Sequence, residues 1–240
     1  RDGFVELMFW PRSDSSFVFG PLLDREKGGV FAIEGVDATQ VSQAYVENTN
    51  VLRTVFSTPN GDFELYDFAP RFVLYDRYYK PPMLLRVIRP LSGEPRAIVR
   101  CKPVYDYGLL EPTSWAASNH AEYRGFPAPM RLTTNVPLAY IEDERPFLIE
   151  RDRHLVLTWG QPLEAGLEDT AERFLERTLD YWRRWVKGTR VPRDYQGEVI
   201  RSALALKLHQ YEDTGALLAA STTSRPEYPG SGRTWDYRYC

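Results

Sequence analysis

The chain has few of the residues that build disulfide scaffolds and metal centres. Its 240 residues include 2 cysteines, Cys101 and Cys240, and 3 histidines. Two cysteines so far apart do not form a dense disulfide framework, and a reducing, cytoplasmic location is expected. His120, His154 and His209 have neither the mutual spacing of metal ligands nor cysteine neighbours, so ordinary core or surface roles are expected. Neither a metal nor a cofactor is predicted.

The sequence also lacks a strong charge of one sign and a long apolar run. The formal net charge is −3 at pH 7, and the basic residues are spread along the chain. Neither a nucleic-acid backbone nor an anionic membrane is therefore an expected partner. No apolar stretch approaches the roughly 20 residues that cross a bilayer, and no basic-then-apolar leader of the secretory type is found. No internal repeat is visible.

What is present fits a folded protein with a sizeable core. Hydrophobic residues make up 43% of the chain, charged residues 26% and aromatic residues 14%. This is ordinary globular usage, and the length is compatible with one large domain or two smaller ones.

Most of the first 160 residues predict an antiparallel β-sandwich. Short runs rich in aromatic and β-branched residues alternate with turn residues. Asn60–Asp62 predicts one hairpin turn, and Ser92–Pro95 predicts a second between the runs that flank it, because Asn and Gly tolerate positive φ. Many short strands with regular turns favour a sandwich. The clearest strand candidates are Phe4–Trp10, Val30–Ile33, Gln40–Val46, Leu52–Ser57, Phe63–Phe68, Leu84–Arg89, Ala97–Val104 and Leu155–Trp159.

Two helices are predicted after the strands. Apolar residues recur every three or four positions over Gly166–Val186, with acids early and bases late, which complements the helix dipole. Lys187 and Gly188 end this helix. A second helix is predicted over Gly197–Tyr211, and its nearly continuous apolar content indicates burial between other helices. Because the two helices cannot bury both apolar faces against the sandwich alone, further helices are expected downstream.

The last eight residues, Arg233–Cys240, combine aromatic rings with charged side chains. Aromatic faces cover the C–H face of a pyranose, while Asp and Arg side chains bind its hydroxyls. The pattern is therefore typical of a sugar-binding subsite. The alternative is a surface loop whose rings pack on a helix.

This end of the chain resembles a known family. The segments Val199–Leu208, Thr214–Ser224, Pro226–Glu227 and Trp235–Cys240 closely resemble the start of the catalytic barrel in glycoside hydrolase family 15. That family holds the glucoamylases and the trehalase-like enzymes of bacteria and archaea. One departure is Arg225, where family members often have Leu.

The amino-terminal part is similar to the β-sandwich domain that precedes the barrel in the same family. Ser13 departs from the pattern, because family members usually carry Phe between the Arg and the Asp of this segment. The departures concern the subgroup more than the family. The matching residues are Arg1–Gly3, Pro11–Ser15, Phe19, Leu22–Asp24 and Gly28–Gly29.

The resemblance implies a fold and a division into domains. The fold is expected to be mainly β, with an antiparallel β-sandwich, or supersandwich, followed by the first helices of an (α/α)6 barrel. Residues 1–162 would form the sandwich, and residues 163–240 the linker helix and the truncated beginning of the catalytic domain.

The resemblance also implies an inverting hydrolysis. Such enzymes use two carboxyl groups, roughly 6.5–9.5 Å apart, one as the acid and one to activate water. In the family both are glutamates that lie beyond the point where this chain stops. No catalytic residue is assigned here, and the chain alone is predicted to be inactive.

Four residues are candidates for substrate binding. Tyr237 matches the family tyrosine whose ring lies against the sugar being cleaved, where its electron-rich face favours developing positive charge. Trp235, Asp236 and Arg238 flank the subsite in the motif, and the alternative is that they serve the fold of their own loop through ring packing and an Asp–Arg pair.

The main functional hypothesis is the release of glucose from the non-reducing end of α-glucans or malto-oligosaccharides, as in a glucoamylase. The expected partner is thus an α-glucan or α-glucoside substrate. One alternative is a trehalase of the same family. Another is that the isolated chain is a non-catalytic carbohydrate-binding or packing module.

Three other charged segments are assigned structural roles. Glu142–Glu144 is predicted to be a solvated, strand-connecting turn. Asp106–Gly108 is predicted to form a turn of the sandwich. Arg12 and Asp14 lie in a loop that could reach the mouth of the barrel, but a structural Asp-Ser turn is favoured.

Overall fold

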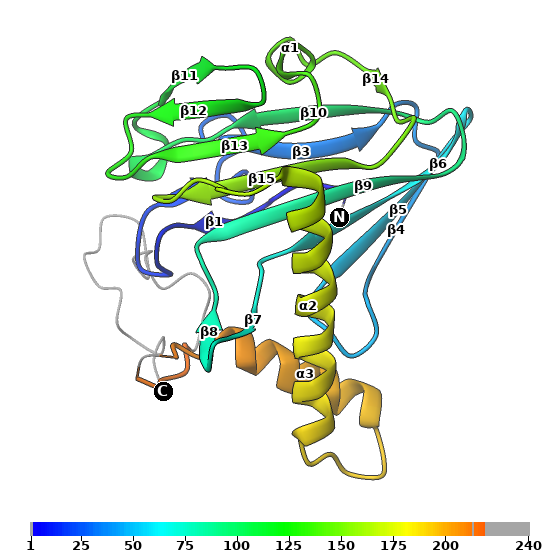
Figure 1. Cartoon of the computed structure of the whole chain (residues 1–240), viewed down its shortest axis with the longest axis vertical. Helices are drawn as coiled ribbons and strands as arrows, with labels where there is room; N and C mark the ends of the chain where they lie inside the picture. The colour runs from blue at the N-terminus through cyan, green and yellow to red at the C-terminus, as the bar shows by residue number, and fades with distance from the viewer. Residues whose placement is uncertain (1, 213, 219–240) are drawn as a thin grey trace.

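The computed structural model describes residues 2–212 and 214–218, and it is mainly β with antiparallel sheets. The largest sheet has eight strands in the order β11-β12-β13-β15-β9-β6-β5-β4 (Figure 1). All its neighbouring strands are antiparallel. The strands of this large sheet are β4 (Gln40–Tyr45), β5 (Leu52–Thr58), β6 (Gly61–Phe68), β9 (Met83–Gly93), β11 (Thr113–Ala116), β12 (His120–Arg124), β13 (Met130–Thr134) and β15 (Arg153–Trp159).

A smaller sheet faces the large one and completes the sandwich. Its three strands have the order β14-β10-β3, and two further pairs, β1-β2 and β7-β8, form short ribbons. A 3-10 turn and a short helix lie in the connections. These elements are β1 (Met8–Phe9), β2 (Phe17–Phe19), β3 (Val30–Gly35), β7 (Phe72–Leu74), β8 (Arg77–Tyr79), β10 (Arg96–Lys102), η1 (Asp106–Gly108), α1 (Leu138–Glu142) and β14 (Phe147–Leu148).

The two central strands of the large sheet are buried on both faces. In β9, Leu84 and Ile88 belong to the core between the sheets, while Leu85 and Val87 face the opposite side. This alternation follows from the two-residue period of a strand. The inner core includes Phe31, Ile33, Phe56, Phe63, Leu65, Leu132, Leu155 and Leu157.

The outer face of the large sheet is covered by α2 (Leu167–Gly188). Ala171, Phe174 and Leu175 of the helix pack with Leu85 and Val156 of the sheet in a second core. The predicted amphipathic helix is therefore confirmed. Its apolar stripe packs directly on the sandwich, so this helix needs no further helices to bury it.

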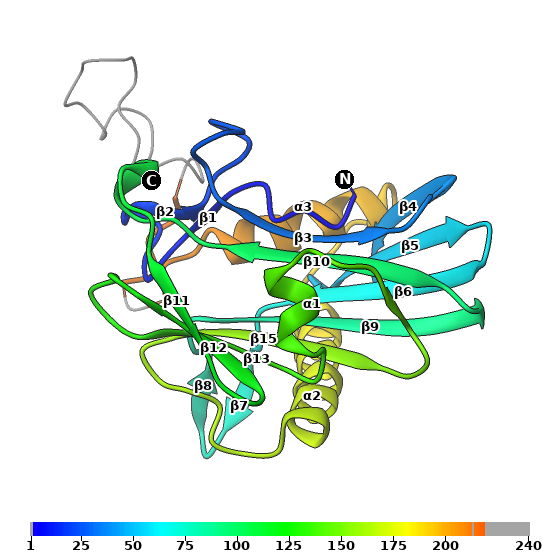
Figure 2. The same ribbon diagram turned by 90° about the horizontal axis from the view of Figure 1, so that it is seen from above.

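The second helix, α3 (Gln196–Leu208), also forms where it was predicted. In Figure 1 it runs across α2 rather than alongside it, and Figure 2 shows that the two helices are displaced from each other. Burial of its apolar residues between other helices stays a prediction, because the described residues contain no helix after α3. Of its residues only Leu204 is buried, whereas Leu206 is 59% exposed and Leu208 is 51% exposed.

Seven of the eight strand candidates are confirmed within a few residues, and Phe4–Trp10 is not. Only Met8 and Phe9 of that segment form a strand, and Phe4 makes an isolated bridge to Ala32. The backbone of this segment bonds irregularly to β3, where the Val5 N–H donates to the Phe31 carbonyl at 2.9 Å. The apolar segment Phe4–Trp10 therefore lies along β3 with irregular hydrogen bonds and does not form a regular strand.

One predicted hairpin is confirmed and the other is wrong. The turn at Asn60–Asp62 joins β5 to β6, which pair through Thr58 and Gly61. The turn at Ser92–Pro95 instead carries the chain from β9 in the large sheet to β10 in the small one. Gly93 has φ +61° there, and the Glu94 N–H donates to the Asn60 carbonyl at 2.7 Å. The same turn residues suit a hairpin within one sheet and a connection between two sheets, so the sequence could not distinguish the two.

A buried arginine joins the amino-terminal segment to the sandwich. Arg86, in β9, has no solvent exposure. Its Nε donates to Asp67 at 2.7 Å, its Nη1 donates to the Phe31 carbonyl at 3.1 Å, and its Nη2 donates to the Gly3 carbonyl at 2.6 Å. The guanidinium also lies 4.6 Å from the centroid of the Phe31 ring. Every nitrogen of this buried cation is therefore satisfied, as burial of a charge requires.

Among the described residues, no helix is both long enough and apolar enough to cross a membrane.

Candidate functional site

The four residues predicted to bind sugar, Trp235, Asp236, Tyr237 and Arg238, lie outside the described residues, as does Cys240. The structure does describe the residues that directly follow α3, 209–212 and 214–218, and the contacts that hold them. Residues 209–218 follow the helix, and the Leu218 N–H donates to the His209 carbonyl at 2.9 Å. The contacts that fix this segment form the candidate site.

Glu212 is the centre of these contacts. Its Oε1 atom accepts from Arg71 Nη2 and from Lys207 Nζ, the latter at 2.8 Å, and its Oε2 lies 3.8 Å from Lys80 Nζ. The side chains of Arg71, Lys207 and Glu212 are only 12%, 16% and 11% exposed. We call Arg71, Lys80, Lys207 and Glu212 the Glu212 cluster. Three cations surround this one carboxylate, and Arg71 among them joins the segment that follows α3 to the loop before β7.

Arg71 also joins the Glu212 cluster to α2. Its backbone N–H donates to Thr178 Oγ1 at 3.2 Å, and its Nε donates to the Tyr181 hydroxyl at 3.1 Å. The guanidinium lies 5.4 Å from the Tyr181 ring centroid and 5.5 Å from that of Trp182. One arginine therefore links three segments that are far apart in the sequence.

A second set of contacts fixes α3 on the turn between β4 and β5. Arg201 Nη1 donates to the Thr49 carbonyl at 2.9 Å, and Asn50 Nδ2 donates to the Leu204 carbonyl at 3.1 Å. The Arg201 guanidinium lies 3.9 Å from the centroid of the Tyr45 ring. Burial lowers the pKa of Arg201 from its ordinary value. These polar contacts hold α3 although it buries little apolar surface.

The loop that contains Arg12 and Asp14 also reaches this region. Arg12 Nε donates to Asp14 Oδ1 at 2.9 Å, and the Arg12 backbone N–H donates to Ser15 Oγ at 3.2 Å. These are the contacts of the predicted structural turn. The Arg12 guanidinium lies 5.8 Å from the Tyr211 ring centroid, so the loop lies against the segment that leaves α3.

Sequence analysis did not find the Glu212 cluster. Arg71 and Glu212 are 141 residues apart, and neither belongs to a recognisable motif. The only available signal was that Glu212 directly follows the predicted second helix. Nothing local indicates that three basic residues converge on that glutamate.

Replacement of Glu212 by Gln is expected to lower stability by about 1 kcal/mol at neutral pH, because the neutral amide attracts the three cations less. Burial alone raises the pKa of Glu212, but Lys207, Arg71 and Lys80 outweigh it and place the pKa below its ordinary value. A lowered pKa gives stability that is present above the unfolded pKa, near 4.5, and is lost as the pH falls through the folded pKa. Urea unfolding at several pH values measures this loss.

The matched control is Glu47→Gln, which removes one carboxylate from an exposed position. We expect the difference between the wild type and Glu212→Gln to shrink below pH 4.5, whereas Glu47→Gln should match the wild type throughout. A constant difference across the acid range would contradict the assignment.

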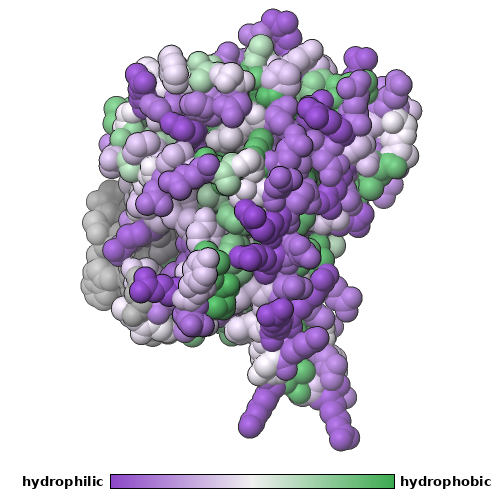
Figure 3. Space-filling view, in the orientation of Figure 1, coloured by the Kyte–Doolittle hydropathy of each residue, from purple (hydrophilic) through white to green (hydrophobic). Residues whose placement is uncertain are grey.

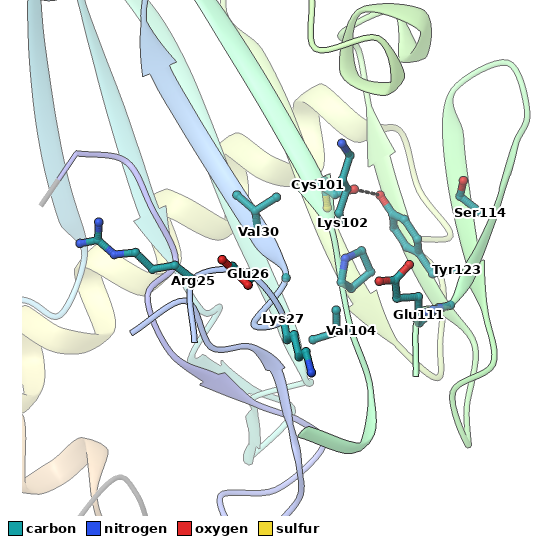
Figure 4. Close-up of a pocket in the computed structure, with 13 residues that line it drawn as sticks. Arg25, Glu26, Lys27, Val30, Cys101, Lys102, Val104, Glu111, Ser114 and Tyr123 are labelled. Atoms are coloured by element: carbon teal, nitrogen blue, oxygen red, sulfur yellow. Dashed lines mark hydrogen bonds between the residues drawn. The ribbon is translucent and has the colours of Figure 1, made fainter. Parts of the chain in front are cut away.

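A groove of about 370 Å³ lies on the sandwich itself (Figure 4). Residues 25–27 form one side, and Glu111, Ser114 and Tyr123 form the other. The Tyr123 hydroxyl donates to the Cys101 carbonyl at 3.0 Å, so it is already in use. Burial raises the pKa of the Cys101 thiol to about 12, so the thiol stays protonated at neutral pH and is a poor nucleophile. The groove offers charged groups for binding but no activated nucleophile.

The three histidines contact other groups of the fold. His154 is buried on β15, its Nε2 lies 2.8 Å from Glu172 Oε1 of α2, and its backbone N–H donates to Asn135 Oδ1 at 2.8 Å. His120 and His209 contact neighbouring residues. No group of three or more metal-ligating side chains occurs among residues 2–212 and 214–218.

The acidic run Glu142–Glu144 differs in part from the prediction. Glu142 ends α1 instead of lying in a turn, and Glu144 is not simply solvated. Glu144 Oε2 accepts from Arg100 Nε at 2.9 Å, and Glu144 Oε1 pairs with Lys102. These contacts with β10 lower the pKa of Glu144, Lys102 contributing most. The predicted turn at Asp106–Gly108 is observed, with positive φ at all three residues.

Comparison with known proteins gives a consistent result over the whole chain. A family model described as "Trehalase-like, N-terminal" matches residues 1–140. The trehalase of Thermoplasma acidophilum is 32% identical over 253 residues, covering 99% of this chain and 42% of the relative. The trehalase of Mycobacterium tuberculosis is 33% identical over 267 residues, covering 99% of this chain and 39% of the relative.

A more distant relative is trehalase 2 of Sulfolobus acidocaldarius, which is 28% identical over 249 residues, covering 100% of this chain and 41% of the relative. The chain thus spans about two fifths of the length of the curated relatives it matches. No solved structure matches the chain significantly.

Proposed function

Because the chain belongs to the trehalase-like N-terminal family, we propose that it forms the amino-terminal part of a glycoside hydrolase that acts on trehalose. The observation that carries this proposal is the similarity to trehalases over 99% of the chain. The relatives are named trehalase, so the comparisons favour the trehalase alternative over the glucoamylase hypothesis that the sequence first suggested.

The domain division expected from the sequence is kept as part of the proposal. Residues 1–162 would be the sandwich, and residues 163–240 would be the linker helix and the opening of an (α/α)6 catalytic domain. The position of α3 supports this division, because Leu206 and Leu208 are about half exposed and available for further packing.

In the proposed mechanism this chain positions substrate and does not carry out proton transfer. Inversion at the anomeric carbon needs one carboxylic acid to protonate the leaving oxygen and one carboxylate to activate water on the opposite face. We propose that both lie outside residues 1–240. Tyr237 would line the subsite for the sugar being cleaved, and Trp235, Asp236 and Arg238 would flank it.

The described structure supports this role through the Glu212 cluster. The cluster fixes residue 212 against Arg71 of the sandwich. Trp235 follows further along the sequence. An efficient reaction needs catalytic groups and substrate-binding groups at fixed relative positions. The Glu212 cluster would provide a fixed starting point for the segment that carries Trp235 to Arg238.

A substrate panel tests the proposal. We expect a protein extended beyond Cys240 to release glucose from trehalose and not from maltose. The chain of residues 1–240 should hydrolyse neither, because it lacks the two proposed carboxyl groups. The measurement is glucose release by the purified proteins under identical conditions.

Two outcomes would contradict the proposal. Activity on maltose but not on trehalose would restore the glucoamylase hypothesis. Turnover by the pure chain of residues 1–240 would show that the acid and the base lie within it. The control for contaminating hydrolases is the same chain with Arg86 replaced, purified in the same way. Because this replacement destabilises the fold, any activity that the variant retains in full belongs to a contaminant.

A further inference from the structure

A second groove lies between the β7–β8 hairpin and the outward face of α2. It has a volume of about 640 Å³. The hairpin contributes Phe72, Val73 and Tyr78, and the helix contributes Tyr181 and Trp185. Figure 3 shows apolar surface at the position of this hairpin, beside the charged side chains that run along α2. We call this the hairpin groove.

The aromatic rings of the hairpin groove are both accessible and held in place. Tyr78 is 55% exposed, and its ring lies edge-on to Tyr181, with centroids 6.1 Å apart and an interplanar angle of 90°. The Tyr181 hydroxyl accepts from Arg71 Nε at 3.1 Å, which fixes its ring. Trp185 packs edge-on against the buried Trp182 at 6.3 Å. Rigid rings bind a partner with little loss of conformational entropy.

The charged side chains of the groove have no net charge. Glu176 and Asp180 supply two carboxylates, and Arg177 and Arg184 supply two guanidiniums. Asp180 and Arg184 are 3.9 Å apart and 56% and 82% exposed, which is a loose contact. Both side chains therefore keep hydrogen-bonding capacity for a ligand.

This combination selects among classes of ligand. A phosphate-bearing ligand would require a net positive groove, and the four charges here sum to zero. A purely apolar partner would leave the carboxylates and guanidiniums desolvated without partners. A neutral sugar satisfies both sets of groups, because its C–H faces lie on aromatic rings and its hydroxyls pair with carboxylate and guanidinium.

We propose that the hairpin groove binds a neutral oligosaccharide. The ligand lies across Tyr78 and Trp185, and its hydroxyls bond to Asp180 and Arg184. Nothing in this inference requires a catalytic residue, so it goes beyond the hydrolase function proposed above and does not depend on it.

The test is titration of the full chain with maltotriose and with trehalose, followed by calorimetry and ligand-observed NMR. We expect binding with a Kd on the order of 1 mM. Tyr78→Ala should weaken it about 5- to 10-fold through the loss of one stacking face. Asp180→Ala should weaken it about 5-fold through the loss of a charged acceptor.

Tyr75→Ala is the matched control, since Tyr75 is on the same hairpin, is 91% exposed and does not line the groove. It should bind as the wild type does. A circular dichroism melt of each variant verifies folding. The proposal would be overturned if neither maltotriose nor trehalose bound at about 10 mM. Equal binding by Tyr78→Ala and Tyr75→Ala would also overturn it.

A Tyr237→Ala variant separates this site from the proposed catalytic subsite. Binding that survives Tyr237→Ala and is lost in Tyr78→Ala supports the hairpin groove. The reverse pattern overturns the groove and leaves the proposed hydrolase function intact.

Discussion

Replacement of Arg86 by Met is expected to lower the free energy of unfolding by about 3–5 kcal/mol, because it removes the fully buried cation of an ion pair whose carboxylate, Asp67, is 17% exposed. Asp67 loses its cation, and the carbonyl oxygens of Phe31 and Gly3 lose their donors. Methionine replaces the stem of the arginine side chain but supplies no donor, so the buried acceptors remain unsatisfied. Urea unfolding monitored by tryptophan fluorescence measures the change.

The matched control is Arg124→Met on β12 of the same sheet. Arg124 pairs with Glu122 at 3.0 Å but is 63% exposed, so its loss should change stability by less than about 1 kcal/mol. Arg86→Lys should recover only part of the lost stability, because an ammonium cannot reach three acceptors in the directions of a guanidinium. Equal stability of Arg86→Met and Arg124→Met would refute the role assigned to Arg86.

Replacement of Tyr237 by Ala in a protein extended beyond Cys240 is expected to lower kcat for trehalose about 5- to 30-fold. The proposed subsite places an aromatic face against a sugar that develops positive charge, an attraction worth about 1–2 kcal/mol. The loss should appear in kcat more than in KM, since the interaction strengthens in the transition state. Steady-state kinetics with trehalose provides the measurement.

Tyr237→Phe is the matched control, because it keeps the ring and removes only the hydroxyl. We expect it to retain most of the rate, and both variants to unfold at the temperature of the wild type. An unchanged kcat in Tyr237→Ala would remove Tyr237 from the subsite. A common loss of folding in both variants would assign it a structural role instead.

The Glu212 cluster and Arg86 illustrate the same physical point. Each is a charged group removed from most or all solvent, and each is balanced by partners that come from distant parts of the chain. Such partners cannot be identified from spacing, because the contact depends on how the layers stack. Sequence patterns indicate which face of a helix or strand is apolar. They do not identify which acidic side chain will pair with which basic side chain.

The hairpin between β7 and β8 shows the same limit for surface features. Sequence analysis assigned no element to Phe72–Tyr79, although Phe72, Tyr78 and Tyr79 are aromatic. The short strands are stabilised by packing on α2, where Phe72 and Tyr79 lie 5.2 Å and 5.3 Å from the ring of Phe174. A two-stranded ribbon of this length needs such packing to be stable. The hairpin groove therefore exists only because the helix returns to this edge of the sandwich.

The sequence by itself determined the mainly β class, seven of the strands, both long helices and the turn at Asn60–Asp62. These depend on local periodicity and turn chemistry, which act between residues close in the chain. Only the tertiary structure decided that Ser92–Pro95 joins two sheets, that α2 covers the outer face of the large sheet, and that Arg71 meets Glu212. Those outcomes depend on long-range packing and on where each buried charge finds its partners, and neither is encoded in a local pattern.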